Sequence, residues 1–190
     1  TAMITASGDI TFANNTASAG VTVESLFFVG GTLSGLAGSG LAVQNNGGDD
    51  LALTANGVFT FATPLLNGSA YSVTVLTQPA NPPQSCVVTN GSGVVTGAPV
   101  SGVQIACTTA SYALVTATAG TGAGSVSLDP AGGTYDHGTV VTVTNTPATG
   151  STFTGWSGAC SGTGSCTVTM DAAKAVTATF TLNSYALVTA

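Results

Sequence analysis

The chain has 190 residues, of which 44% are hydrophobic and only 4% are charged. One lysine, no arginine and a formal net charge of −6 exclude a nucleic-acid-binding protein, because phosphate binding requires a basic surface. The same composition argues against binding to anionic membranes. No apolar run approaches the roughly 18 residues of a transmembrane helix, so no membrane partner is expected.

The first predicted elements lie in residues 1–29, where two apolar stretches flank a polar one. We interpret this part as an N-terminal strand segment. Residues 30–109 then contain about seven short runs rich in Val, Thr, Phe and Tyr, which predict a β-sandwich of immunoglobulin-like or transthyretin-like kind. Among them, Leu51–Ala62 predicts a hairpin whose type I′ turn is Asn56-Gly57. Further turns are predicted at two segments of similar composition, Asn45–Asp50 and Thr89–Gly93.

A second, smaller β unit is predicted at residues 110–182. Three segments in it alternate between two faces as strands do: Thr139–Thr146, Cys166–Met170 and Ala175–Leu182. No segment of the chain combines a 3.6-residue period with the capping residues of a helix. The sequence therefore predicts an all-β chain made of two small β modules in tandem.

Four cysteines, Cys86, Cys107, Cys160 and Cys166, allow three disulfide connectivities. They contain no Cys-x₂-Cys pair with histidine partners, so a metal site is not indicated. Pairing of the cysteines nearest in sequence gives each module its own bridge, which predicts Cys86–Cys107 and Cys160–Cys166. Disulfides imply an oxidising compartment. We expect an extracellular or cell-surface protein whose signal peptide has already been removed.

One heptapeptide, Ser-Tyr-Ala-Leu-Val-Thr-Ala, occurs twice, at Ser111–Ala117 and at Ser184–Ala190. The first copy is predicted to open the second module. The second copy makes residues 183–190 either an orphan strand or the start of a next repeat. Because an unpaired strand needs a partner, we predict an inter-subunit strand made of Tyr185, Ala186, Leu187, Val188, Thr189 and Ala190.

Catalytic and metal-binding residues are scarce. His137 is the only histidine, and its neighbour Asp136 would point to the opposite face of a strand, so no serine triad is expected. No pair of carboxylates fits a glycosidase. We therefore expect no enzyme, no cofactor and no metal. The one cation candidate is calcium at a loop rich in oxygen ligands, although the same residues also form turns unaided: Asn45, Asp49 and Asp50.

Four aromatic residues of the second module suggest two different roles: Trp156, Phe153, Tyr112 and Tyr135. Exposed on one face, they would form a platform for sugar rings, which makes polysaccharide a candidate partner. In a module this small, large aromatic side chains also fill the core, and this is the role we expect.

Two motifs in the second module point to a known family. Phe153–Gly158 reads Phe-x-Gly-Trp-Ser-Gly, and Val168–Phe180 reads Val-Thr-Met-Asp-x-x-Lys-x-Val-Thr-Ala-x-Phe. Residues 110–182 thereby resemble the divergent InlB B-repeat modules of bacterial surface and secreted proteins. Gly31–Leu51 is similar to modules that precede such repeats. The resemblance implies an extracellular β-module, usually in tandem, that serves as a stalk, spacer or adhesive part and carries no catalytic residue.

Two non-enzymatic functions are consistent with these features. In the first, the chain is a subunit of a fimbria-like surface filament, and its partners are copies of itself joined by strand complementation. In the second, the chain supplies the stalk or polysaccharide-binding accessory modules of a larger secreted adhesin or enzyme. Further repeats of the same chain would then follow the second heptapeptide.

Overall fold

The computed structural model describes residues 2–5 and 22–185, which form strands, turns and connecting segments. None of these residues belongs to a helix that could cross a bilayer. They divide into two compact units, within residues 1–108 and 109–190. Turn residues such as Asn46 and Asn90 adopt positive φ angles of 51° and 54°, a conformation that asparagine tolerates well. The predicted all-β fold is confirmed.

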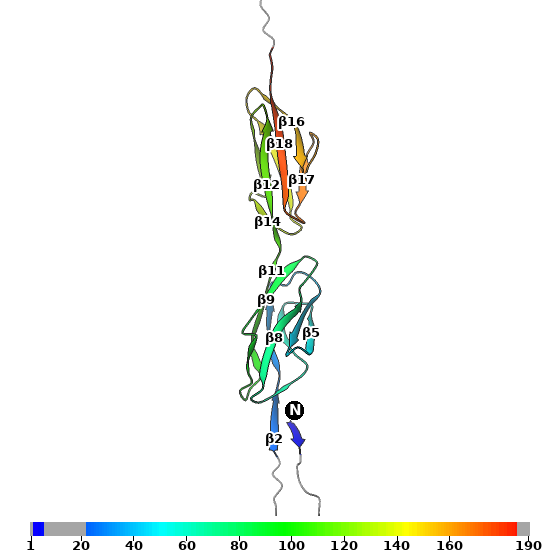
Figure 1. Ribbon diagram of the computed structural model, residues 1–190, viewed down its shortest axis with the longest axis vertical. Coiled ribbons are helices and arrows are strands. Elements are labelled where there is room, and N and C mark those ends of the chain that lie inside the picture. Colours follow the sequence, from blue (N-terminus) through cyan, green and yellow to red (C-terminus); the bar gives the residue numbers. More distant parts are fainter. Residues whose placement is uncertain (1, 6–21, 186–190) are drawn as a thin grey trace, which may run out of the picture. The chain divides into compact units, whose positions relative to one another are not determined.

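The first unit contains eleven strands among its described residues. In chain order they are β1 (Ala2–Thr5), β2 (Thr22–Phe27), β3 (Val29–Ser34), β4 (Leu41–Asn45), β5 (Asp49–Leu53), β6 (Gly57–Thr60), β7 (Leu65–Leu66), β8 (Ala70–Thr77), β9 (Gln84–Thr89), β10 (Ser92–Val94) and β11 (Val100–Thr109). Two four-stranded sheets, ordered β10-β8-β4-β5 and β6-β3-β11-β9, supply residues to one core (Figure 1). A third sheet joins β1, β2 and β7.

The core of this unit follows the two-residue period of its strands. Val103, Ile105 and Cys107 of β11 are buried at alternate positions, as expected when one face of a strand is covered. β11 pairs in parallel with β3, which opens with the fully buried Val29. The sequence predicted that this module starts at residue 30, but its core already includes Val29. β2 also belongs to this unit, because it pairs with β7.

The predicted hairpin at Leu51–Ala62 is wrong. β5 pairs with β4, whereas β6 pairs with β3 in the other sheet. Asn56 accounts for the difference: its side-chain oxygen accepts a hydrogen bond from the N–H of Leu36 at 2.8 Å, and its amide nitrogen donates to the Leu36 carbonyl at 2.9 Å. These two hydrogen bonds hold the segment between β5 and β6 against Leu36, where the chain crosses from one sheet to the other. β6 is then an edge strand of the second of these sheets.

The strand count of the first unit also differs from the prediction. Nine strands, β3 to β11, lie in the region where the sequence predicted about seven. The shortest, β7 and β10, have two and three residues, too few to show the alternation that reveals a strand. Cys86 of β9 and Cys107 of β11 form the disulfide expected for this unit, between neighbouring strands.

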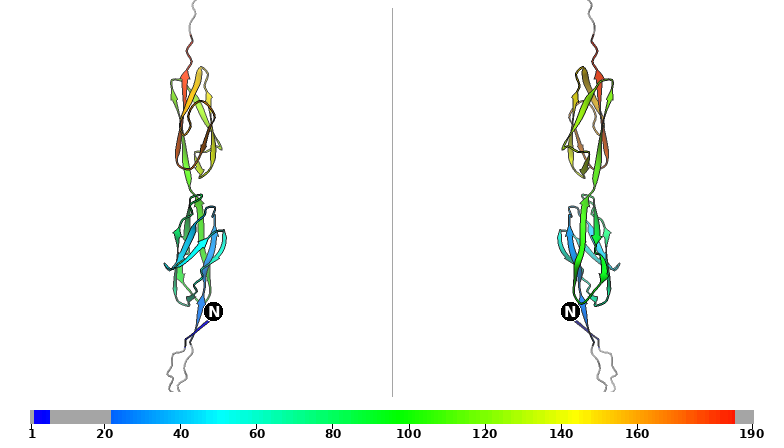
Figure 2. Two further views of the ribbon diagram at one scale, coloured as in Figure 1. Left: turned by 90° about the vertical axis from the view of Figure 1, so that its right-hand side faces the viewer. Right: turned by 90° about the vertical axis from the view of Figure 1, so that its left-hand side faces the viewer.

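The second unit has seven strands among its described residues. They are β12 (Ser111–Gly120), β13 (Gly124–Asp129), β14 (Thr134–Asp136), β15 (Val140–Pro147), β16 (Ser151–Gly158), β17 (Cys166–Thr169) and β18 (Lys174–Leu182). Figure 2 shows this unit from two sides. Its two sheets are ordered β14-β12-β18-β16 and β13-β15-β17. Both sheets supply residues to one core, where Val141, Met170 and Phe180 are fully buried. Cys160 and Cys166 form the second expected disulfide.

Candidate functional site

The first copy of the heptapeptide forms the beginning of β12, an interior strand of its sheet. Leu114–Gly120 pairs in parallel with β18, and Ser111–Ala113 pairs antiparallel with β14. Leu114 is 3% exposed and Tyr112 packs against the same core, whereas Val115 on the opposite face is 60% exposed. The heptapeptide thus has a core-facing side that carries Tyr and Leu and an outer side that carries Val.

The second copy begins at Ser184, and only Asn183 separates it from the end of β18 at Leu182. Its first two residues, Ser184 and Tyr185, are described, and the Tyr185 side chain is 83% exposed. The rest of the predicted inter-subunit strand lies outside the described residues: Ala186, Leu187, Val188, Thr189 and Ala190. The described part of the second unit therefore ends with an aromatic ring presented to solvent.

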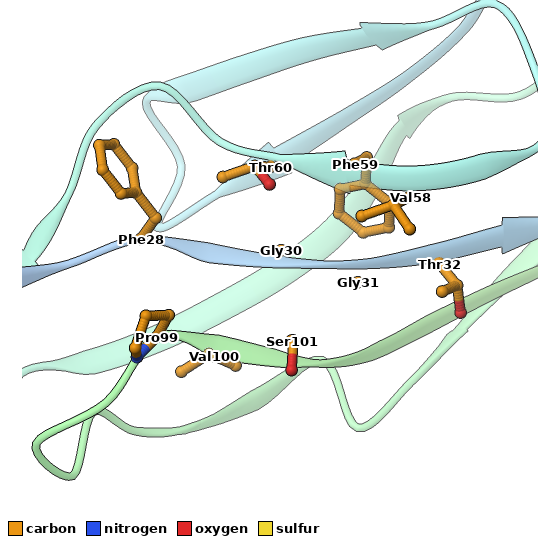
Figure 3. A pocket seen from close by; sticks show the side chains of 10 residues that line it. All are labelled: Phe28, Gly30, Gly31, Thr32, Val58, Phe59, Thr60, Pro99, Val100 and Ser101. Carbon is orange, nitrogen blue, oxygen red and sulfur yellow. The ribbon is translucent and has the colours of Figure 1, made fainter.

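The first unit carries a groove of about 440 Å³ over β6, β3 and β11 (Figure 3). Gly30 and Gly31 of β3 form its floor. A Cβ atom at Gly30 would overlap the carbonyl oxygen of Phe59, and a Cβ atom at Gly31 would overlap that of Val103. Glycine is therefore needed at both positions for β3 to lie this close to its neighbours, and the floor of the groove is bare backbone.

The walls of this groove are mostly apolar and carry no charged residue. Val58 and Thr60 line the β6 side, and Val100 lines the β11 side (Figure 3). Phe28 and Pro99 lie at the end where β3 and β11 begin, and Phe28 is partly exposed. Such a surface favours an uncharged, largely apolar occupant.

β6 borders the groove and is an open sheet edge. The N–H of Phe61 donates to the carbonyl of Val29 at 2.8 Å, which fixes the direction of the backbone groups along this strand. By alternation, Phe59 also faces β3, while Val58 and Thr60 direct their N–H and C=O groups away from it. Within the described part of the chain, these outward groups meet no other strand.

Of the three calcium candidates, Asn45 and Asp49 line one hollow of about 230 Å³, and Asp50 does not line it. Each already accepts a hydrogen bond from the protein: Asn45 Oδ1 from the Ser72 N–H at 3.1 Å, Asp49 Oδ2 from the Thr63 N–H at 2.9 Å, and Asp50 Oδ1 from the Gln44 side-chain amide at 2.6 Å. Asp49 and Asp50 are consecutive in β5 and point to opposite faces. These oxygens stabilise the β4–β5 turn and its surroundings, and in the described residues no three His, Cys, Asp or Glu side chains gather as a metal site would require.

His137 and Asp136 do not form an acid–base pair. Asp136 is exposed in β14, and the Nδ1 atom of His137 is buried without a hydrogen-bond partner among the described residues. The His137 ring lies against Tyr112, with ring centroids 6.0 Å apart. This histidine is thus packed beside β12.

Lys174 pairs with Asp171, with 2.8 Å between nitrogen and oxygen. The hydrogen bond from Lys174 holds the pKa of the Asp171 carboxyl below its ordinary value. Because the folded-state pKa is the lower one, any stabilisation is present above the unfolded-state pKa and is lost as the pH falls through the folded-state pKa. We expect Lys174→Gln to raise the Asp171 pKa in an NMR titration and hardly to change stability, because the Asp171 carboxyl is exposed. An unchanged pKa would contradict the assigned cause.

The four aromatic residues considered as a platform for sugar rings are core residues, as expected. Trp156 and Tyr135 are buried, and Phe153 and Tyr112 pack against the same cluster. Trp156 lies against Phe153 with ring centroids 4.9 Å apart, and its Nε1–H donates to the Gly164 carbonyl at 3.1 Å. These side chains form no exposed platform for sugar rings.

Comparison with known families bears on the second unit. The model of the divergent InlB B-repeat domain matches residues 112–184, which span β12 to β18. This part of the chain is similar to that domain. The similarity, together with the two disulfides, indicates an extracellular module of a bacterial surface protein. The match does not extend to the first unit, and no curated protein matches the chain.

The groove and the open edge of β6 were not predicted from the sequence. Both depend on the pairing of β6 with β3, which the expected hairpin at Asn56-Gly57 obscured. One local signal was available: Gly30-Gly31 interrupts an apolar run at a position where a strand ordinarily carries side chains. Paired glycines in a strand indicate close approach of a backbone.

Proposed function

We propose that the protein is a non-enzymatic structural subunit of an extracellular filament, and that its subunits join by strand complementation. The observation that carries this proposal is the second heptapeptide, Ser184–Ala190, whose sequence equals that of the opening part of β12. In β12 that sequence buries Leu114 and packs Tyr112 against a core. The second copy has the same apolar side, which needs a sheet to cover it.

The composition of the chain supports long-lived contacts between subunits. Only 4% of the residues are charged, so a subunit interface has few ion pairs or charge repulsions. Salt screens interactions between exposed charges and leaves apolar and backbone contacts largely unaffected. Assembly is therefore expected to persist from low to high ionic strength.

A second candidate function is a stalk of tandem repeats, with or without polysaccharide binding. It is favoured by the way each heptapeptide follows a long strand: one residue separates Thr109 of β11 from Ser111, and one separates Leu182 of β18 from Ser184. The second copy would then open a further repeat. A glycan array tests whether this stalk binds polysaccharide. Polysaccharide binding predicts a signal from particular glycans on the array, and its absence would contradict that form of the candidate.

The filament proposal is tested by negative-stain microscopy of the full chain beside a chain that lacks Ser184–Ala190. We expect filaments from the full chain and monomers from the shortened one, because the donated strand is gone. Monomers from both would contradict the proposal and favour the stalk. Filaments from both would show that assembly uses another surface.

Two single substitutions test the same proposal without shortening the chain. Leu187 corresponds to the buried Leu114, and Val188 corresponds to the exposed Val115. Leu187→Ser is expected to abolish filaments, whereas Val188→Ser, one residue away, is expected to leave them intact. Equal loss from both substitutions would contradict a two-faced donated strand.

A further inference from the structure

We propose that the surface which receives the donated strand is the open edge of β6 together with the groove beside it, in the first unit of a second copy. This inference rests on the proposed function and names its acceptor. The place that the first heptapeptide occupies in the second unit is already filled by β12, which pairs with both β14 and β18. The second heptapeptide therefore needs a different sheet.

The backbone of β6 offers the hydrogen-bonding groups that an added strand requires. Val58 and Thr60 direct their N–H and C=O groups away from β3. A strand laid along this edge extends the sheet β6-β3-β11-β9 by one member. The edge strand β5 of the other sheet carries Asp49 and Asp50, so an uncharged strand fits β6 better.

The side chains of donor and acceptor have the same spacing. Tyr185 and Leu187 are two residues apart, so in an extended donated strand they would lie on one face, about 6.6 Å from each other. Val58 and Thr60 are also two residues apart, and both border the groove. Paired across neighbouring strands, aromatic and aliphatic side chains stabilise a sheet.

The groove provides a place for the exposed Tyr185 ring. Its floor at Gly30 is bare backbone, and its walls at Val58 and Val100 are apolar. An aromatic ring that lies across Thr60 covers the backbone left exposed at Gly30, which has no side chain. Aromatic residues cover glycines in sheets in this way. Neither the groove nor the heptapeptide contains a charged side chain, so no charge is buried without a partner.

The test compares two substitutions on the two edges of one sheet. Val58 of β6 is 84% exposed and Val87 of β9 is 58% exposed, so lysine at either position leaves the core untouched. Val58→Lys is expected to yield monomers, because the charge would lie against the apolar side chains of the donated strand beside it. Val87→Lys is expected to form filaments like the unchanged chain. Circular dichroism melting curves confirm that both variants are folded.

A mixing experiment then isolates a single junction. A Val58→Lys chain keeps its donated strand but has lost its acceptor, while a Leu187→Ser chain keeps its acceptor but has lost its strand. Each alone is expected to be monomeric. Together they are expected to form a one-to-one dimer with twice the 18.3 kDa mass of one chain, measured by light scattering.

Other outcomes overturn the inference in distinguishable ways. Filaments that persist in Val58→Lys but vanish in Leu187→Ser would leave strand donation standing and place the acceptor elsewhere. Mixed chains that stay monomeric would mean that the strand of the Val58→Lys chain does not bind the β6 edge of the Leu187→Ser chain, and would overturn the assigned acceptor. Monomers from the unchanged chain would overturn both the acceptor and the proposed function.

Discussion

Replacing Trp156 with alanine is expected to destabilise the second unit by about 3–5 kcal/mol, the usual cost of removing a large buried aromatic side chain. Trp156 is 5% exposed, and its indole lies against Phe153. Its backbone N–H donates to the Gly162 carbonyl at 2.7 Å, and its Nε1–H donates to that of Gly164. Removal of the indole thus leaves a cavity and loosens the loop closed by the Cys160–Cys166 disulfide.

The control for this prediction is Trp156→Phe, which keeps an aromatic ring at this position and loses the Nε1–H donor together with part of the indole volume. Its expected cost is about 1–2 kcal/mol. Urea denaturation followed by circular dichroism measures both variants, with the first unit as an internal reference. Equal destabilisation by alanine and phenylalanine would mean that the hydrogen bond to Gly164, rather than packing, determines the contribution of Trp156.

Three strands of the second unit, β15, β17 and β18, were predictable because each has one covered face. Val141 and Val143 are buried in β15, and Val176, Ala178 and Phe180 are buried in β18, with exposed or half-exposed residues between them. Such alternation is a local property, readable from any window of five residues. The disulfide pairs were predictable for a related reason, since each closes a loop within one unit.

Strand partners were not predictable in the same way. β12 and β18 form the parallel pair at the centre of the second unit, yet about 60 residues separate Leu114 from Lys174 in the sequence. Local turn chemistry at Asn56 suggested a hairpin, whereas its side chain bonds Leu36, 20 residues earlier. The candidate acceptor depends on that long-range pairing, so the open edge of β6 became visible only in the folded chain.

Removing the Cys86–Cys107 disulfide by a double alanine substitution is expected to destabilise the first unit by about 3 kcal/mol. The bridge joins residues 21 positions apart, and closing a loop of this size restricts the unfolded chain by about that amount. Both sulfurs also lie in the core, where alanine leaves unfilled space. Circular dichroism should show a lower denaturation midpoint for the first unit.

The single tryptophan of the chain makes this prediction specific to one unit. Trp156 is buried in the second unit, so its fluorescence follows the unfolding of that unit. The Cys86→Ala and Cys107→Ala chain should retain the fluorescence midpoint of the unchanged protein. Double alanine substitution of Cys160 and Cys166, which closes a shorter loop, should lower that midpoint by an amount corresponding to about 2 kcal/mol. If removal of the first bridge lowered the fluorescence midpoint as well, the two units would unfold as one cooperative body, and acceptor and donor in the proposed filament would depend on each other for stability.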